Sequence, residues 1–213
     1  MKEKPYLEIN EIIECIGQVA KILHDKPEDA LKELREISSL IDSKIPIHNG
    51  HTQRVSEYSL KIGKQLNLTD KEMVNLEAAA LLHDFGKIAV DKEIFLKPAS
   101  LTENEKLEVG MHVLRGCYIL QGFAELAEAL QGVISHHEHY NGSGYPDGLS
   151  EDNIPLAGRI IAVVDAYDAM ISKRPYRKAR TKEEAIKELK ELSGKQFDPQ
   201  IVKVFISIIE IVK

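Results

Sequence analysis

Apolar residues recur every three or four positions along almost the whole chain, which is the spacing of an amphipathic α-helix. The strict apolar and polar alternation of a β-strand is scarce. Helix start signals agree with this pattern: "TDKE" (69–72), "TENE" (102–105) and "TKEE" (181–184) each place a threonine three residues before a glutamate, as in a capping box. The pattern therefore predicts an all-α fold.

The bounds of the helices follow from these signals and from the apolar periodicity. "DP" at 198–199 favours a helix start, because aspartate caps orphan N–H groups and proline fits the first helical position. The predicted helices cover residues 7–24, 28–43, 50–66, 70–83, 102–114, 123–137, 155–172, 181–192 and 199–212. Proline and glycine interrupt the chain in "KIPIHNG" (44–50). We therefore expect residues 1–45 to form a helical segment for packing or dimerisation, and residues 46–213 to form the domain that carries the chemistry.

Two aspartates stand in strongly apolar surroundings. "LEAAALLHDFGK" is apolar on almost every side and ends in His83 and Asp84. A carboxylate at the buried C-terminal end of a helix is destabilised by the loss of water and by the helix dipole. Both penalties predict a nearby cation, which is either a metal ion or Lys87 in a simple ion pair. Asp165 raises the same question, because it lies inside the apolar helix "RIIAVVDAYDAM".

Several histidines also lie on apolar helix faces or at helix ends. Taken singly, each could be a core histidine with a satisfied hydrogen bond. Together with the two aspartates they form a set on five predicted helices: His51, His83, Asp84, His112, His136, His137 and Asp165. Imidazoles and carboxylates suit Fe, Mn, Zn or Ni, and seven ligands are too many for one ion. The set predicts a site for two divalent ions, a common device for cleaving phosphodiesters.

Composition narrows the class of ligand. A net charge of −6 argues against a binder of long nucleic acid, whereas a small phosphate ligand needs only a local basic cluster. "SKRPYRKAR" (172–180) supplies such a cluster, although a solvated loop would look similar. The glycines of "NGSG" (141–144) favour a turn or lid over a phosphate cradle, because they do not join a strand to a helix. The lack of a signal peptide and of a long apolar run predicts a cytoplasmic protein without membrane contact.

The motifs, taken in their order along the chain, indicate a family. The chain carries His51, "HDFGK", His112, "HHE", "GSGYP", "VDAYDAM" and "RPYR" in that order, and it closely resembles the HD-GYP phosphodiesterases over roughly residues 48–205. These enzymes are a branch of the HD superfamily of metal-dependent phosphohydrolases. The resemblance implies an α-helical HD core with additional C-terminal helices. It also implies hydrolysis of cyclic di-GMP to pGpG, and in some members on to GMP, by a hydroxide that bridges two metals.

The resemblance also implies residue roles. The implied ligands of one ion are His51, His83, Asp84 and Asp165. Asp84 bridges to a second ion, whose further implied ligands are His112, His136 and His137. Lys87 is expected to act beside Asp84 by stabilising charge on the scissile phosphate. The implied substrate contacts are Lys87, Gly144, Tyr145, Pro146, Arg174 and Arg177. Fe or Mn is the expected metal, with Ni or Zn as alternatives.

Two positions depart from the family pattern. Some members hold a third metal through a glutamate four residues before the first histidine, where this chain has Ile47, although His48 lies nearby. We therefore expect two ions. Members usually carry "DGSGYP", whereas this chain has Asn141, which removes a carboxylate from the loop and is expected to alter loop order.

Two other functions stay open on sequence grounds. One is hydrolysis of another cyclic dinucleotide or nucleotide, because such substrates share phosphates and differ only in base edges. The other is a non-catalytic signalling module that binds cyclic di-GMP or a diguanylate cyclase. The intact ligand set favours the enzyme. The expected partners are a cyclic dinucleotide substrate, a second copy of the chain and a diguanylate cyclase.

Overall fold

The computed structural model describes residues 9–45, 48, 50–97, 99–172 and 178–211. The α-helices are α1 (Ile9–Ala20), α2 (Pro27–Lys44), α3 (His51–Gln65), α4 (Asp70–Leu82), α5 (Lys92–Leu96), α6 (Glu103–Gly110), α7 (His112–Leu120), α8 (Ala127–Ser135), α9 (Leu156–Ile171), α10 (Lys182–Leu192) and α11 (Pro199–Ile211). Three 3-10 helices are η1 (Phe85–Ala89), η2 (Ala124–Leu126) and η3 (Glu151–Asn153). Within the described ranges there is no β-strand, only two isolated bridges, so the predicted all-α class is confirmed.

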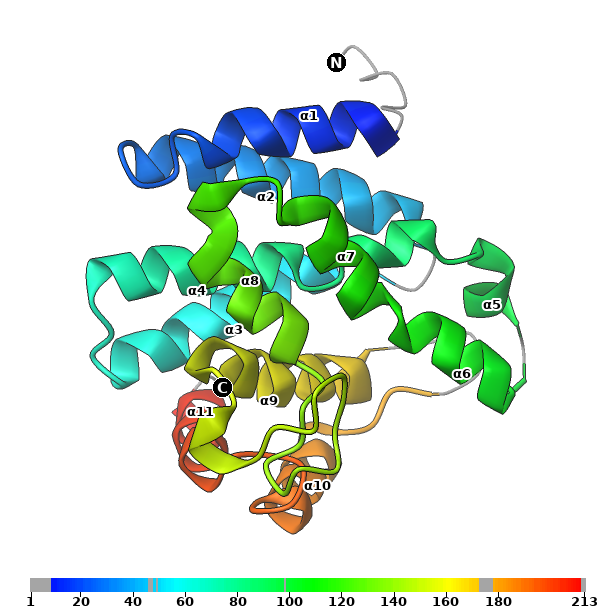
Figure 1. The fold of residues 1–213 in the computed structure, drawn as a ribbon. Coiled ribbons are helices and arrows are strands. Elements are labelled where there is room, and N and C mark those ends of the chain that lie inside the picture. Colours follow the sequence, from blue (N-terminus) through cyan, green and yellow to red (C-terminus); the bar gives the residue numbers. More distant parts are fainter. Residues whose placement is uncertain (1–8, 46–47, 49, 98, 173–177, 212–213) are drawn as a thin grey trace.

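Helix α4 lies at the centre of the molecule. It packs against α3, α8, α2 and α9, and its residues from Asn75 to Leu82 are all buried. Figure 1 shows α1 and α2 on one side of this core and α10 and α11 on the opposite side. A helix surrounded in this way is expected to be apolar on almost every face, which explains the lack of an amphipathic pattern in "LEAAALL"; its buried carboxylate, Glu77, pairs with Arg35. The C-terminal end of α4 therefore delivers His83 and Asp84 into the interior.

The predicted capping boxes are all present. Thr69, Thr102 and Thr181 each accept a hydrogen bond from the backbone N–H three residues on, and the glutamate there accepts one from the threonine N–H. These boxes satisfy N–H groups that have no partner within the helix. They fix the starts of α4, α6 and α10 at the predicted residues to within one position.

One predicted helix, residues 102–114, is wrong. The structure has two helices in its place: α6 ends at Gly110, and α7 begins at His112 and continues to Leu120. The ring Nδ1–H of His112 donates to the carbonyl of Val109 at 2.7 Å, so this ring competes for a carbonyl that a continuous helix would use. His112 is therefore at the start of a helix and not in the middle of one.

A second predicted helix, residues 123–137, is too long. A 3-10 turn, η2, precedes α8, and α8 ends at Ser135 with His136 as its C-cap. The short helices η1, α5 and η3 were not predicted, because five residues or fewer give no readable periodicity. Among the described helices, none is both long and apolar enough to cross a membrane.

Candidate metal centre

Asp84, at the junction of α4 and η1, is the centre of the site. Its carboxylate is buried, and Oδ1 faces Nε2 of His112 at 3.2 Å and Nε2 of His136 at 4.0 Å. The ring of His137 packs against both, with centroids 5.1 Å from His112 and 4.1 Å from His136. We call His112, His136 and His137 the imidazole half of the site. They come from the start of α7 and the end of α8.

The other oxygen of Asp84, Oδ2, faces a second group of side chains. Nε2 of His48 lies at 3.1 Å, Nε2 of His51 at 3.6 Å and Nε2 of His83 at 3.4 Å. Nζ of Lys87 lies at 2.6 Å, so the simple ion pair considered from the sequence is formed as well. One carboxylate thus stands between two clusters of imidazoles, with one oxygen turned to each.

Asp165 completes the second cluster from α9. Its Oδ1 lies 3.3 Å from Nε2 of His51, which is itself 3.3 Å from Nε2 of His83. We call His48, His51, His83 and Asp165 the carboxylate half of the site. The structure therefore gathers all seven side chains predicted as metal ligands around one point. Their role as ligands stays a prediction.

Backbone carbonyls orient three of the rings in the same way. Nδ1–H of His83 donates to the carbonyl of Ala80, and Nδ1–H of His136 donates to that of Val133, each at 2.7 Å. His112 repeats this contact with the carbonyl three residues before it. Each histidine follows or lies close to a helix C-terminus, where carbonyls lack helical partners. With Nδ1 carrying the proton, Nε2 presents its lone pair to the cluster, as a metal ligand must.

His51 is oriented by a side chain instead. Its Nδ1 lies 2.7 Å from Oδ2 of Asp168, and Asp168 also accepts two hydrogen bonds from Arg54, at 2.6 and 3.0 Å. Sequence reasoning missed Asp168. The signal was available, because Asp165 and Asp168 in "VDAYDAM" are three residues apart and so share a helix face.

Charge differs between the two halves. Burial disfavours the protonated ring of His51, but Asp168 and Asp84 outweigh it and raise the pKa of His51 to about 9. Burial lowers the pKa of His136 and of His137 well below 6.5, so both rings are neutral at pH 7. Burial alone would raise the pKa of Asp84, yet Lys87 and the histidines hold it well below its usual range. At pH 7 the imidazole half therefore offers the neutral rings of His136 and His137, whereas the metal-free carboxylate half contains a protonated His51 beside the ionised Asp84.

The spacing of these donor atoms fits metal ions. Two atoms that each lie about 2.1 Å from one ion, at angles of 90° to 110°, are roughly 3.0 to 3.5 Å apart. Most of the donor separations around Asp84 lie between 3.1 and 3.6 Å. Oδ1 of Asp84 is buried and has no hydrogen-bond partner among the described residues, which costs free energy unless a cation lies there. The donor set is that of Fe, Mn, Zn or Ni sites.

The glycine of "HDFGK", Gly86, is required by a close contact between two backbone segments. A Cβ at this position would lie 2.0 Å from the carbonyl oxygen of His112. Only glycine allows η1 to approach α7 this closely. The contact brings the two halves of the site together, because η1 follows Asp84 and α7 begins with His112.

The loop that follows His137 covers the imidazole half. The ring of Tyr145 stacks on His137, with centroids 5.0 Å apart and planes 25° apart, and Tyr145 is 40% exposed. Gly144 packs against backbone, since a Cβ would lie 2.2 Å from the amide nitrogen of His139. This close approach requires a glycine at position 144, independently of the role in substrate binding that was predicted for Gly144. Pro146 follows Tyr145 through a cis peptide bond.

Asn141 keeps the turn that an aspartate would make. Its Oδ1 accepts hydrogen bonds from the N–H of Ser143 at 3.1 Å and from the hydroxyl of Ser143 at 2.7 Å. Amide and carboxylate oxygens serve equally well as acceptors in such a turn. The departure from "DGSGYP" is therefore compatible with a closed turn at this position.

The remaining predicted residues are placed as follows. Lys87 is 12% exposed at its side chain and Asp165 is 19% exposed, so both lie where the cluster meets solvent. Arg174 and Arg177, predicted to bind substrate, lie outside the described residues. His48, which sequence reasoning left without a role, lies within the cluster.

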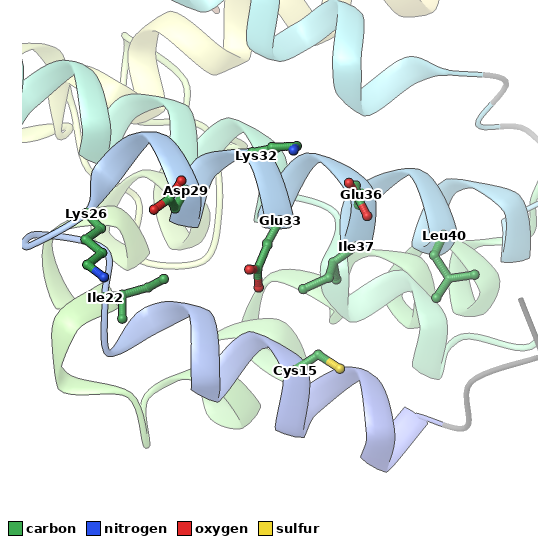
Figure 2. A pocket seen from close by; sticks show the side chains of 9 residues that line it. All are labelled: Cys15, Ile22, Lys26, Asp29, Lys32, Glu33, Glu36, Ile37 and Leu40. Atoms are coloured by element: carbon green, nitrogen blue, oxygen red, sulfur yellow. The ribbon is translucent and has the colours of Figure 1, made fainter.

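A groove of about 580 Å³ lies between α1 and α2 (Figure 2). Its lining residues are Cys15, Ile22, Lys26, Asp29, Lys32, Glu33, Glu36, Ile37 and Leu40. It carries charges of both signs, and none of its residues belongs to the site around Asp84.

Comparison with known proteins identifies the family. The family of the HD domain matches residues 35–201, a range that begins within α2 and contains every described member of the cluster. A cyclic di-GMP phosphodiesterase of Thermotoga maritima is 37% identical over 184 residues, which are 85% of this chain and 50% of that protein. A 3′3′-cGAMP-specific phosphodiesterase of Vibrio cholerae is 36% identical over 161 residues, which are 76% of this chain and 35% of that protein. The chain thus spans half or less of the length of these relatives.

The fold has a counterpart among solved structures. Bd1817, an HDG"Y"P protein from Bdellovibrio bacteriovorus, superposes with a TM-score of 0.66 at 20% identity, covering 99% of this chain and 74% of that one. At this identity the likeness supports the fold alone. With the sequence match it confirms the resemblance that the motifs predicted: the chain belongs to the HD domain family.

Proposed function

We propose that this chain hydrolyses cyclic di-GMP to pGpG. The observation that carries the proposal is the buried Asp84 carboxylate, with one oxygen turned to each of two imidazole clusters. The name of the Thermotoga maritima relative supports the choice of substrate. In the proposed reaction the oxygen of water joins phosphorus, one P–O3′ bond breaks, and the freed 3′ oxygen takes a proton. The product keeps a 5′ phosphate, as pGpG does.

Two divalent ions, Fe or Mn by preference, are part of the proposal. His51, His83 and Asp165 would hold one ion, His112, His136 and His137 the other, and Asp84 would bridge them. When bound, such ions polarise phosphoryl oxygens and lower the pKa of water. Metal content near two per chain after anaerobic purification is the expected result, and one or three per chain would refute this count.

The residues of the chain itself supply charge and position. Lys87 places an ammonium 2.6 Å from Oδ2 of Asp84, at the solvent-facing edge of the cluster. We propose that it donates to a non-bridging oxygen of the scissile phosphate and stabilises the charge that develops there. Asp84 holds this ammonium in place. Arg54 and Asp168 fix His51, so the carboxylate half does not need to reorganise when substrate binds.

A cyclic dinucleotide carries a second phosphate and two bases, which need contacts of their own. The exposed face of Tyr145, held against His137, offers a surface on which guanine can stack. Lys87 also lines a cleft of about 330 Å³ together with Lys44 and Lys92. Three lysines on one cleft suit the second phosphate. Gly144, Pro146, Arg174 and Arg177 complete the proposed substrate contacts.

The test is product analysis under reducing conditions. Protein loaded with Fe²⁺ or Mn²⁺ is incubated with cyclic di-GMP, and the products are separated by chromatography and identified by mass. The expected result is pGpG, formed faster than any GMP. Loss of the reaction in Asp84→Ala, but not in Asp152→Ala at an exposed carboxylate, would exclude a contaminating enzyme. Binding of cyclic di-GMP without turnover would favour the non-catalytic signalling module.

A second substrate has support of its own. The Vibrio cholerae relative is named for 3′3′-cGAMP and is nearly as similar to this chain as the Thermotoga maritima relative. The same assay with 3′3′-cGAMP and with both dinucleotides in competition decides between the two. A higher kcat/KM for 3′3′-cGAMP would overturn the choice of cyclic di-GMP and leave the reaction class unchanged. Association with a second copy or with a diguanylate cyclase remains a prediction.

A further inference from the structure

His48 and Asp42 form a buried pair that the two proposed ligand sets do not use. His48 is 3% exposed and Asp42, on α2, is 5% exposed. Nδ1 of His48 lies 3.1 Å from Oδ1 of Asp42. Asp42 also accepts hydrogen bonds from the backbone N–H and the hydroxyl of Thr52, in the first turn of α3. The carboxylate of Asp42 therefore fixes the ring of His48 in one orientation.

The other nitrogen of His48 points at the centre of the site. Nε2 lies 3.1 Å from Oδ2 of Asp84, and the donor atoms of His48, His51 and Asp84 lie within 4.8 Å of one another. All three side chains are buried. The arrangement repeats that of His51, whose Nδ1 is held by Asp168 while Nε2 faces Asp84 and Asp165.

A hydrogen bond from His48 to Asp84 is the alternative, and it requires a ring that carries protons on both nitrogens, because Nδ1 already faces Asp42. If Nδ1–H donates to Asp42 and Nε2 carries no proton, Nε2 presents its lone pair to Asp84. A lone pair and a carboxylate oxygen 3.1 Å apart repel each other unless a cation lies between them. Oδ2 of Asp84 already accepts from Lys87 at 2.6 Å. A separation of 3.1 Å is also that of two donors bound to one ion.

We infer that His48 is an additional ligand of the ion bound at Oδ2 of Asp84, and that Asp42 is its positioning residue. The carboxylate half then holds its ion with three imidazoles, as many as the imidazole half. Carboxylates that orient ligand histidines in this way commonly strengthen metal binding 10- to 100-fold. The inference rests on the metal centre proposed above, and it extends that centre to α2.

The test distinguishes the roles of the two ring nitrogens of His48. In His48→Asn, the side-chain amide takes the place of Nδ1–H and keeps the hydrogen bond to Asp42, while the nitrogen that faces Asp84 is lost. Two controls match it: His24→Asn changes an exposed histidine outside the cluster, and Thr52→Val breaks a hydrogen bond to Asp42 without changing His48. Each protein is titrated with Mn²⁺ against a competing chelator, and Co²⁺ loading is followed by visible absorption.

In His48→Asn, one of the two Mn²⁺ sites should weaken at least tenfold, and the Co²⁺ spectrum should change because the ion loses a ligand. His24→Asn should behave like the wild type. Thr52→Val should lower the melting temperature and leave both Mn²⁺ affinities within about threefold. Unchanged affinities and an unchanged Co²⁺ spectrum in His48→Asn would overturn the inference and leave His48 as a structural link.

Wild-type protein gives an independent answer if His48→Asn does not fold. Anomalous diffraction from crystals grown with Mn²⁺ locates the ions directly. An ion at Oδ2 of Asp84 within bonding distance of Nε2 of His48 supports the inference, and an ion there without this bond overturns it. If wild-type protein binds no Mn²⁺, the proposed metal centre itself fails, which distinguishes the two claims.

Discussion

The imidazole half and the carboxylate half share Asp84 but are built differently. In the imidazole half, His112 and His136 are oriented by backbone carbonyls at helix ends. In the carboxylate half, His83 is also oriented by a carbonyl, but His48 and His51 are oriented by the carboxylates of other helices. A carbonyl at a helix end is fixed by the backbone and survives any side-chain substitution. A carboxylate on another helix depends on one residue and on the packing that brings it there.

The two halves also differ in charge. The carboxylate half includes Asp165 and is supported by Asp168 and Asp42, with Lys87 at its edge. In the imidazole half, Asp84 is the only carboxylate that the described contacts provide. Protons should therefore compete with metal more strongly in the carboxylate half. The comparison predicts that each half can be disturbed separately.

The largest effect is expected at the residue that both halves share. Asp84→Ala should lower metal content from about two ions per chain to nearly none and reduce activity by at least about a thousandfold, because both ions lose a ligand. Metal analysis by mass spectrometry and a phosphodiesterase assay measure this. If Asp84→Ala still bound one ion at wild-type affinity, the two halves would not share the carboxylate.

The next largest effect, a loss of metal affinity, should be confined to the carboxylate half. Asp168→Asn weakens the acceptor for His51 and leaves the imidazole half intact, so one metal affinity should fall about 10- to 100-fold and the other should not change. Titration with Mn²⁺ against a chelator resolves the two sites. Equal losses at both sites would show that Asp168 acts through the fold and not through His51.

The pH dependence of metal affinity should differ between the two halves of the site. The pKa of His51 is raised to about 9, so in the metal-free fold at pH 7 its ring carries a second proton and a positive charge. A metal ion must displace this proton. Affinity for that ion should rise about tenfold per pH unit between pH 6.5 and 8.5. The pKa values of His136 and His137 are lowered, so these rings are already neutral and release no second proton over this pH range. The affinity for their ion should therefore change little.

Calorimetric titration with Mn²⁺ in two buffers of different ionisation enthalpy counts the protons released. About one proton should accompany the ion of the carboxylate half and almost none that of the imidazole half. Equal proton release from both sites would contradict the assignment of charge to the halves.

The smallest effect is expected at the loop over the imidazole half. Tyr145→Phe keeps the ring that stacks on His137 and removes only a hydroxyl, so KM for cyclic di-GMP should change less than about threefold. Tyr145→Ala removes the stacking surface and should raise KM by roughly 5- to 100-fold, as expected for base stacking on an aromatic ring. Steady-state kinetics compares the two. Equal KM values would show that Tyr145 does not contact the base.

Much of the site could be predicted from the sequence. Aspartates at the end of "LEAAALLHD" and within "RIIAVVDAYDAM" stand in apolar surroundings, where a carboxylate without a partner is costly, so the sequence predicted a cation near Asp84 and Asp165. Capping boxes gave the starts of three helices, because they depend on residues only three positions apart. The division of 102–114 into two helices could not be predicted, since it depends on where the ring of His112 lies.

His48 marks the limit of this reasoning. Beside Ile47, which cannot bind metal, it had no readable pattern, and its meaning depends on Asp42 in a segment predicted only to pack or dimerise. The boundary predicted at residue 46 stays a prediction. Asp42 nevertheless contacts His48 across it, so removal of residues 1–45 should weaken metal binding as well as packing.

The sequence by itself determined the class of fold, the set of candidate metal ligands and the family to which they point. Helical periodicity and capping are local properties, and burial of an unpaired charge is unfavourable wherever it occurs. Only the tertiary structure decided which oxygen of Asp84 faces which imidazoles, and that α2 contributes to the site. These relations depend on distances between helices, and the close approach at Gly86 that sets one of them is a property of packed backbone.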